Sequence, residues 1–159
     1  MLKLLRFAIP LAAITTLLVA ASPAAAQTTV TYRVTFVENA GGQATCPPGT
    51  SCGTANIAGV GHLTTQMIVF NACGPNCHLR TITFEDGSTI LVRESIVNII
   101  SPGNSASAGA NAPIFFEISQ TIVSGTGAFE GVTGSGTGRV NTNADGGSII
   151  TASGMITFP

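Results

Sequence analysis

The sequence predicts an all-β domain, an antiparallel up-and-down β-barrel of about eight strands, with a β-sandwich as the alternative. Runs of alternating apolar and polar residues recur along the chain, and no segment shows a sustained 3.6-residue apolar period. The connections are short and rich in glycine, which favours an antiparallel meander over parallel strands joined by helices. A barrel would also hide the strand edges that otherwise invite aggregation.

The alternation predicts seven strands, or eight if one of the long strands breaks at a glycine. In the first, Val30, Tyr32, Val34 and Phe36 alternate with threonine and arginine, as in a half-buried strand. Residues 39–56 and 101–112 are predicted to be loops because they are rich in small and turn-forming residues. The predicted strands are 28–38, 57–71, 78–84, 88–100, 113–124, 129–141 and 148–158.

The first 26 residues are predicted to be a signal peptide that is removed. Lys3 and Arg6 precede an apolar run, and the alanines at 24–26 provide a small-residue cleavage site. Removal leaves 27–159 as a single β-barrel domain that is secreted or periplasmic, with no membrane anchor.

The charge balance excludes one class of partner. All seven acidic residues lie after residue 27, where the chain has four arginines and no lysine. Nucleic-acid binding requires many cations to neutralise phosphates, so no nucleic-acid partner is expected. With one tyrosine and no tryptophan, the chain also lacks the aromatic girdles of an outer-membrane barrel.

The four cysteines occupy two glycine- and proline-rich segments. In an exported protein an even number of cysteines indicates disulfides, and the local pairs Cys46–Cys52 and Cys73–Cys77 are favoured over the other pairings. A metal site built from Cys73, Cys77 and His78 is the lesser alternative, since the usual Cys-x-x-Cys spacing is missing. No metal and no cofactor is expected.

Residues 121–140 combine strand-like runs with a Gly-Thr-Gly-Ala-Phe-Glu-Gly turn that begins at Gly125. Glycine inside strand-like sequence marks a bulge or a corner, and a closed sheet needs such corners. The segment resembles the strand–turn–strand signature of the allene oxide cyclase and dirigent barrel families. The resemblance covers the chain from about Gly87 onward and is sharpest at Gly125–Gly136.

The resemblance implies a barrel of eight antiparallel strands, often packed into oligomers, with an apolar cavity open at one end. Members of these families guide the cyclisation or radical coupling of a reactive small molecule. The plant cyclases carry a Glu-x-Asn run, followed by a proline, after the first strand. Here Glu38 and Asn39 are adjacent and the next proline is Pro47, so the cyclase site is not reproduced.

The hairpin turn at 85–87 predicts which side chains share a face. A three-residue turn ending at Gly87 puts His78 opposite Glu94 and Arg80 opposite Val92. If this face lines the interior, the ionisable groups could protonate or orient a substrate carbonyl, because desolvation shifts pKa values. The predicted catalytic residues are His78, Arg80 and Glu94, and the predicted ligand-binding residues are Phe84, Val92, Asn98 and Phe116.

The alternative is that the same residues have a purely structural role. Arg80 and Glu94 would then form an ordinary cross-strand ion pair, and a one-residue change of register would separate them. The functional hypothesis is an exported barrel that binds a small apolar ligand, with isomerase or cyclase activity and self-association as further expectations. The alternative is a non-catalytic structural or surface-interaction module with a packed core, and the sequence does not decide whether the protein is an enzyme.

Overall fold

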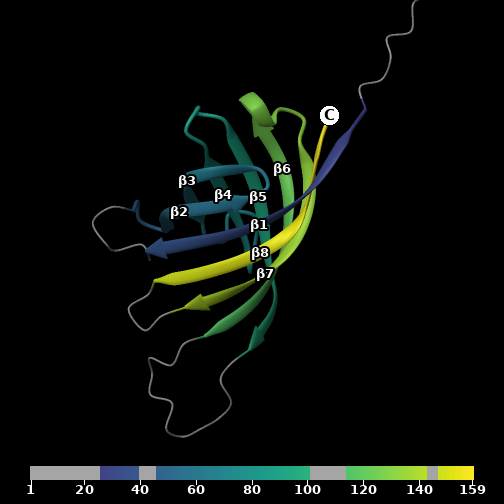
Figure 1. Ribbon diagram of the computed structural model, residues 1–159. Coiled ribbons are helices and arrows are strands. Elements are labelled where there is room, and N and C mark those ends of the chain that lie inside the picture. Colours follow the sequence, from purple (N-terminus) through teal and green to yellow (C-terminus); the bar gives the residue numbers. More distant parts are fainter. Residues whose placement is uncertain (1–25, 40–45, 101–113, 143–146) are drawn as a thin grey trace, which may run out of the picture.

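The computed structural model describes residues 26–39, 46–100, 114–142 and 147–159, which form a closed β-barrel. Within these residues eight strands follow one another in chain order, and each pairs antiparallel with the next (Figure 1). β1 also pairs with β8, which closes the sheet. The elements are β1 Thr28–Asn39, β2 Thr50–Ala58, β3 Gly61–Val69, β4 Cys77–Thr83, β5 Thr89–Ile100, β6 Phe115–Thr126, the 3₁₀ helix η1 Gly127–Phe129, β7 Thr133–Thr142 and β8 Ser148–Phe158.

The predicted barrel is therefore confirmed, and the sandwich alternative is wrong. Six of the predicted strands agree with β1 and β4 to β8 to within a few residues. No helix in the described chain is long and apolar enough to cross a membrane.

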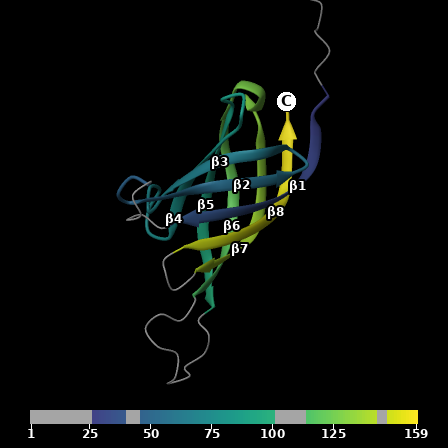
Figure 2. The ribbon, with the colours of Figure 1, turned by 60° about the vertical axis from the view of Figure 1, so that its left-hand side comes forward.

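The barrel has two ends of different construction (Figure 2). The turn end carries the tight β2–β3 and β4–β5 turns, η1 and the end of β8. β1, β3, β5 and β7 end at the mouth end (Figure 2). At the turn end Gly87 has a φ of 83°, as the predicted hairpin turn requires.

The loop predicted over 39–56 was wrong for residues 50–56, and residues 40–45 lie outside the described residues. A loop was expected over 39–56, whereas β2 begins at Thr50 and pairs with β1. The chain reverses at Gly59, whose φ of 93° favours glycine, so the expected strand 57–71 begins only at Gly61, as β3. β2 contains few strong strand formers, and its pairing with β1 on one side and β3 on the other provides the strand geometry.

The half of the barrel toward the turn end is filled by apolar side chains. Phe84 stacks on Phe129 at a ring separation of 4.3 Å, and Phe129 lies 6.1 Å from Phe158, so three aromatic rings close this end. A void of about 20 Å³ remains among the interior residues, which is room for about a single water molecule. Its lining includes Tyr32, Val34, Ile82, Ile90, Val92 and Ile156.

β7 contributes almost no side chain to this interior. Gly134, Gly136 and Gly138 alternate with exposed residues along the strand. A Cβ on Gly136 would lie 2.3 Å from the hydroxyl oxygen of Tyr32. These three β7 glycines therefore make room for side chains from other strands of the barrel.

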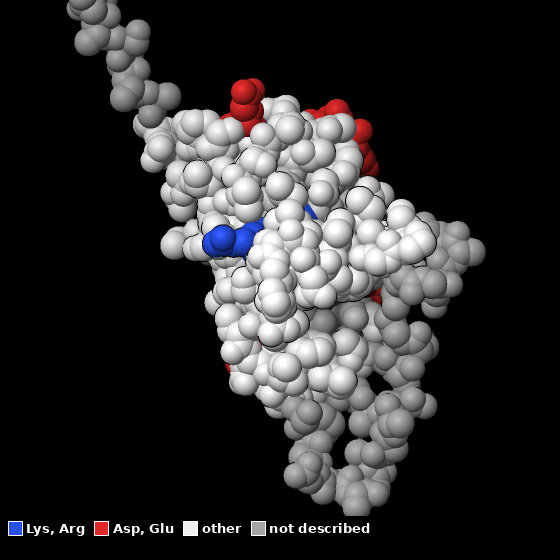
Figure 3. Space-filling model, turned by 180° about the vertical axis from the view of Figure 1, so that it is seen from behind, with Lys and Arg blue, Asp and Glu red and all other residues white. Residues whose placement is uncertain are grey.

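The outer surface carries few charges. Figure 3 shows a face that is largely uncharged, with acidic side chains gathered at the turn end. Glu85 and Asp86 in the β4–β5 turn and Glu130 after η1 are exposed there. Two further carboxylates lie inside the barrel, at the boundary between its two halves.

Candidate functional site

A cavity of about 280 Å³, the mouth cavity, lies inside the half of the barrel toward the mouth end. Its volume exceeds the space of one water molecule by about an order of magnitude. Apolar side chains form most of the wall, among them Ile68, Phe70, Ile96, Phe116, Val140 and Ile150. The ionisable residues in its lining are Glu38, His78, Arg80 and Glu94.

Arg80 is the centre of this ionisable group. It comes from β4, and only 1% of its surface is exposed. Its Nε donates to Oε1 of Glu94 and its Nη2 donates to Oε2, both at 2.8 Å, so the pair is bidentate. Burial by itself lowers the pKa of Arg80, but the charges and hydrogen bonds of Glu94 and Glu38 outweigh burial and raise it. The guanidinium is therefore firmly held in its charged form.

The third nitrogen of Arg80, Nη1, forms hydrogen bonds to two further strands. Nη1 donates to Oε1 of Glu38 on β1 and to Oε1 of Gln66 on β3. The guanidinium carbon lies 4.1 Å from the ring centre of Phe36, within the range of a cation–π contact. One side chain thus ties β1, β3, β4 and β5 together across the interior.

A hydrogen-bonded chain extends this group toward the filled half. Nε2 of Gln120 donates to Oε1 of Glu94 at 2.7 Å, and the hydroxyl of Tyr32 donates to Oε1 of Gln120 at 2.9 Å. Burial and the charge of Glu94 raise the pKa of Tyr32 from 10.0 to about 12. We call these six residues the polar layer, and they are Tyr32, Glu38, Gln66, Arg80, Glu94 and Gln120.

His78 stands at the side of the mouth cavity. Its Nδ1 accepts a hydrogen bond from the backbone N–H of Asn71 at 3.0 Å, so the neutral ring carries its proton on Nε2. Its ring meets Phe70 edge-on at 5.4 Å. Burial lowers the pKa of His78; the charge of Glu94 opposes this shift, and that of Arg80 adds to it.

The structure brings most of the predicted catalytic and ligand-binding residues together. The register of β4 and β5 pairs His78 with Glu94 and Arg80 with Val92, as the hairpin turn predicted. His78, Arg80, Glu94 and Phe116 all line the mouth cavity. The Arg80–Glu94 pair is not an exposed surface pair but a buried one.

Three predicted ligand-binding residues lie elsewhere. Phe84 packs in the aromatic group at the turn end, and Val92 faces the filled half. Asn98 is exposed because the β5–β6 register shifts between Ile96 and Asn98, which turns Asn98 outward. There it donates to Glu117 at 3.2 Å on the outer surface.

Sequence reasoning missed four members of the polar layer. Glu38 continues the inward alternation of Tyr32, Val34 and Phe36, so the first-strand pattern extended by two residues would have identified it. Gln120 likewise follows Ile118 by two positions in β6. Gln66 likewise precedes the buried Ile68 by two positions in β3, so the same alternation identifies it.

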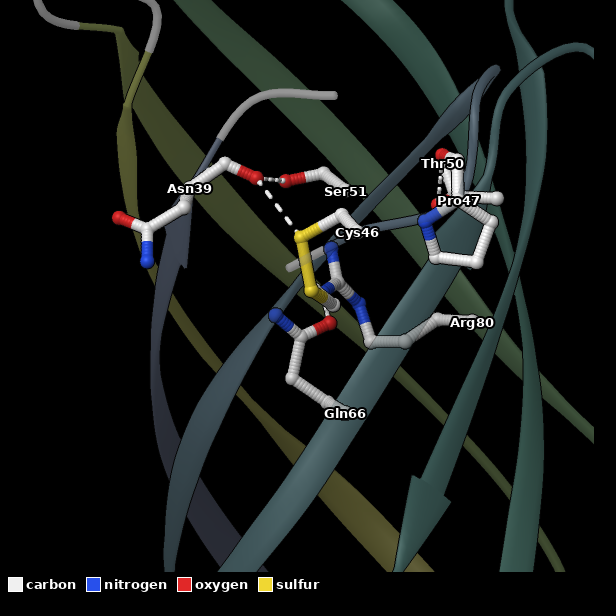
Figure 4. Close-up of a disulfide and its surroundings, with 8 residues drawn as sticks. Asn39, Cys46, Pro47, Thr50, Ser51, Gln66 and Arg80 are labelled. Carbon is white, nitrogen blue, oxygen red and sulfur yellow. Dashed lines mark hydrogen bonds between the residues drawn. A yellow bond between two sulfur atoms is a disulfide. The ribbon is translucent and has the colours of Figure 1, made fainter. Parts of the chain in front are cut away.

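Both predicted disulfides are present. Cys46 joins Cys52 with a Cα separation of 5.7 Å, and Cys73 joins Cys77 at 5.1 Å. Figure 4 shows the first disulfide beside Gln66 and Arg80, so this crosslink lies at the mouth end, next to the polar layer. Ser51 donates to the backbone oxygen of Asn39 at 2.7 Å and links β2 to the end of β1.

The polar layer consists of two carboxylates, two amides, a guanidinium and a phenol. Among the described residues, no group of three or more histidine, cysteine, aspartate or glutamate side chains is placed to hold a metal ion. The positive charge at this site comes from a side chain, that of Arg80.

Comparison with known proteins gives one structural likeness. No family model matches the chain, and no curated protein matches it. Among solved structures the chain is similar to a pterocarpan synthase dirigent protein, with 16% identity, a TM-score of 0.41, and coverage of 84% of this chain and 86% of that one. The barrel of eight antiparallel strands that the sequence resemblance implied is the fold observed here.

Proposed function

We propose that this protein binds a small molecule with an apolar body and a polar head in the mouth cavity. The observation that carries the proposal is the contrast inside one barrel between a filled half and a cavity of about 280 Å³ with a polar floor. Apolar walls with a few fixed polar groups are typical of small-molecule sites. A purely structural module would have little use for a buried ion-pair layer beside empty space, since such layers are costly to build.

Native mass spectrometry of the protein purified from its natural compartment tests the proposal. We expect an adduct of a few hundred daltons, the size of molecule that such pockets hold. Ile150→Phe would put a ring into the cavity, because Ile150 lines it and is 1% exposed. Ile149→Phe is the matched control, because Ile149 precedes it in β8 and is 44% exposed. Loss of the adduct in both variants, or in neither, would count against the mouth cavity as the site.

A second candidate is proton-transfer catalysis of an isomerisation or cyclisation at the same site. The observation that favours it is the presence of Glu38, Glu94 and His78 around one apolar cavity. Groups in such surroundings can exchange protons with carbon next to a carbonyl. The test is deuterium exchange into cyclohexanone in D₂O, followed by NMR with wild type and Glu94→Gln. Equal exchange rates with the two proteins, or rates no faster than buffer, would reject this candidate.

Export is the third part of the proposal. The N-terminal segment has the order of a signal peptide, and two disulfides suit an oxidising compartment. We expect the intact mass of exported protein to correspond to a chain that begins at Gln27 with all four thiols oxidised. A mass that includes residues 1–26, or four free thiols, would reject it.

A further inference from the structure

The polar layer carries more negative than positive charge. Arg80 supplies one guanidinium, and Glu38 and Glu94 supply two carboxylates, each paired with it. All three side chains are at least nine-tenths buried. With both carboxylates ionised, one negative charge is left over in a site of low polarity, where an uncompensated charge is costly.

Four of the five N–H groups of Arg80 already have acceptors. Nε and Nη2 are used by Glu94, and Nη1 is used by Glu38 and Gln66. The second N–H of Nη2 could give a ligand carboxylate one hydrogen bond, whereas a bidentate contact would displace one of these partners, and the carboxylate would add to the excess of negative charge. The arrangement therefore disfavours acids.

Glu38 is the acceptor that remains. Its Oε1 accepts from Arg80, whereas its Oε2 has no hydrogen-bond partner among the residues that the structure describes. Glu38 is 5% exposed and lines the mouth cavity. A ligand group that donates hydrogen bonds and carries positive charge would satisfy this oxygen and balance the layer.

Two other features of the cavity suit a cation. Phe70 and Phe116 line it, and aromatic rings attract ammonium groups that lie within about 6 Å of the ring centre. His78 does not supply the missing charge near neutral pH, because burial keeps its pKa below the usual value. The Arg80 charge, which would repel a cation, is offset by its bidentate pair with Glu94.

We propose that the ligand of the mouth cavity is an apolar amine, held with its ammonium group at the Glu38 carboxylate and its hydrocarbon body against the isoleucine and phenylalanine wall. The inference rests on the ligand-binding function proposed above and adds the chemical class of the ligand.

The test uses three ligands of one shape: 1-adamantanemethylamine, 1-adamantanemethanol and 1-adamantanecarboxylate. Calorimetric titration of the mature protein at neutral pH should give at least tenfold tighter binding of the amine than of the alcohol. The carboxylate should bind most weakly. Raising the salt concentration should leave this order intact, because buried charges are screened less than exposed ones.

Two substitutions test whether Glu38 causes the preference for the amine. Glu38→Gln keeps the shape of the side chain and removes its charge, so the amine and the alcohol should then bind within about threefold of each other. Glu130→Gln removes an exposed carboxylate at the turn end, and the amine preference should remain. An equal loss of preference in both variants would mean that overall charge, rather than Glu38, selects the amine, and would overturn the proposal.

The possible failures are distinguishable. If the alcohol binds as tightly as the amine to wild type, the amine inference is wrong while the ligand-binding function stands. If none of the three binds at millimolar concentration, both are wrong for molecules of this size. The wild-type comparison decides these outcomes even if Glu38→Gln does not fold.

Discussion

The two halves of the barrel interior are built from the same strands and differ in almost every other respect. Toward the turn end, branched apolar side chains and three aromatic rings leave a void of only about 20 Å³. Toward the mouth end, a cavity of about 280 Å³ remains. The polar layer lies between them. Its hydrogen-bonded chain of Tyr32, Gln120 and Glu94 runs from the filled half to the cavity half.

The difference separates the half that stabilises the fold from the half that would hold the proposed ligand. The filled half buries the apolar surface that drives folding. The layer holds β1, β3, β4 and β5 at fixed separations, so the cavity half keeps its shape without a packed centre.

Removing the cation of the layer should have the largest effect. Arg80→Met leaves Glu38 and Glu94 buried without their partner, which we expect to cost about 3–5 kcal/mol in the free energy of unfolding. Arg139→Met is the control, because the Arg139–Glu117 pair is exposed and should contribute less than about 1 kcal/mol. Urea titrations of both variants measure the difference, and similar losses would contradict the central role of Arg80.

Truncation of an isoleucine should cost more in the filled half than in the cavity half. Ile156→Ala opens a hole in close-packed surroundings, so we expect a loss of about 3–4 kcal/mol. Ile68→Ala enlarges a cavity that already exists, and about 1–2 kcal/mol is expected. Thermal unfolding of the two variants compares them; an inverted order would show that the mouth cavity is not open space in solution.

Ionisation of Tyr32 should report on the layer at high pH. Its pKa is raised from 10.0 to about 12, so the unfolded chain loses the phenolic proton first and stability falls as pH rises from 10 to 12. Tyr32 is the only tyrosine of the chain and no lysine follows residue 3, so few other groups titrate there. Absorbance near 295 nm follows the ionisation, and a midpoint near pH 10 in the folded protein would contradict the buried contact with Gln120.

The smallest effect is expected at His78. Its pKa is lowered by burial, so the unfolded chain binds the proton more readily and stability falls as pH drops below 6.5. Glu94→Gln removes the charge that opposes this shift and should lower the pKa of His78 further. NMR titration of the imidazole Cε1–H signal measures both values. A rise of the pKa in the variant would show that Glu94 does not act on His78.

The hairpin of β4 and β5 shows how far sequence can predict this fold. Glu85-Asp86-Gly87 identified both the turn and the register, because a three-residue turn leaves one way to pair the strands. The prediction failed at Asn98, where the bulge near Ile96 reverses the alternation. A bulge depends on the partner strand, and the partner of β5 beyond Ser95 could not be read from β5 itself.

The layer was only partly predictable for a related reason. Local pairing revealed His78, Arg80 and Glu94, whereas Glu38, Gln66 and Gln120 come from strands distant in the sequence. They meet because the sheet closes, which is a property of the whole chain. β2 was not predicted as a strand because its residues are mostly polar, and its pairing with β1 and β3 provides its strand geometry.

The aromatic rings at the turn end make the two ends of the barrel interior different. Among the described residues, Phe84, Phe129 and Phe158 close the barrel axis on the side of the polar layer away from the mouth cavity. The barrel interior is therefore closed at the turn end. The proposed ligand would then enter and leave by the same opening, so a bound molecule would have to leave before the next could enter.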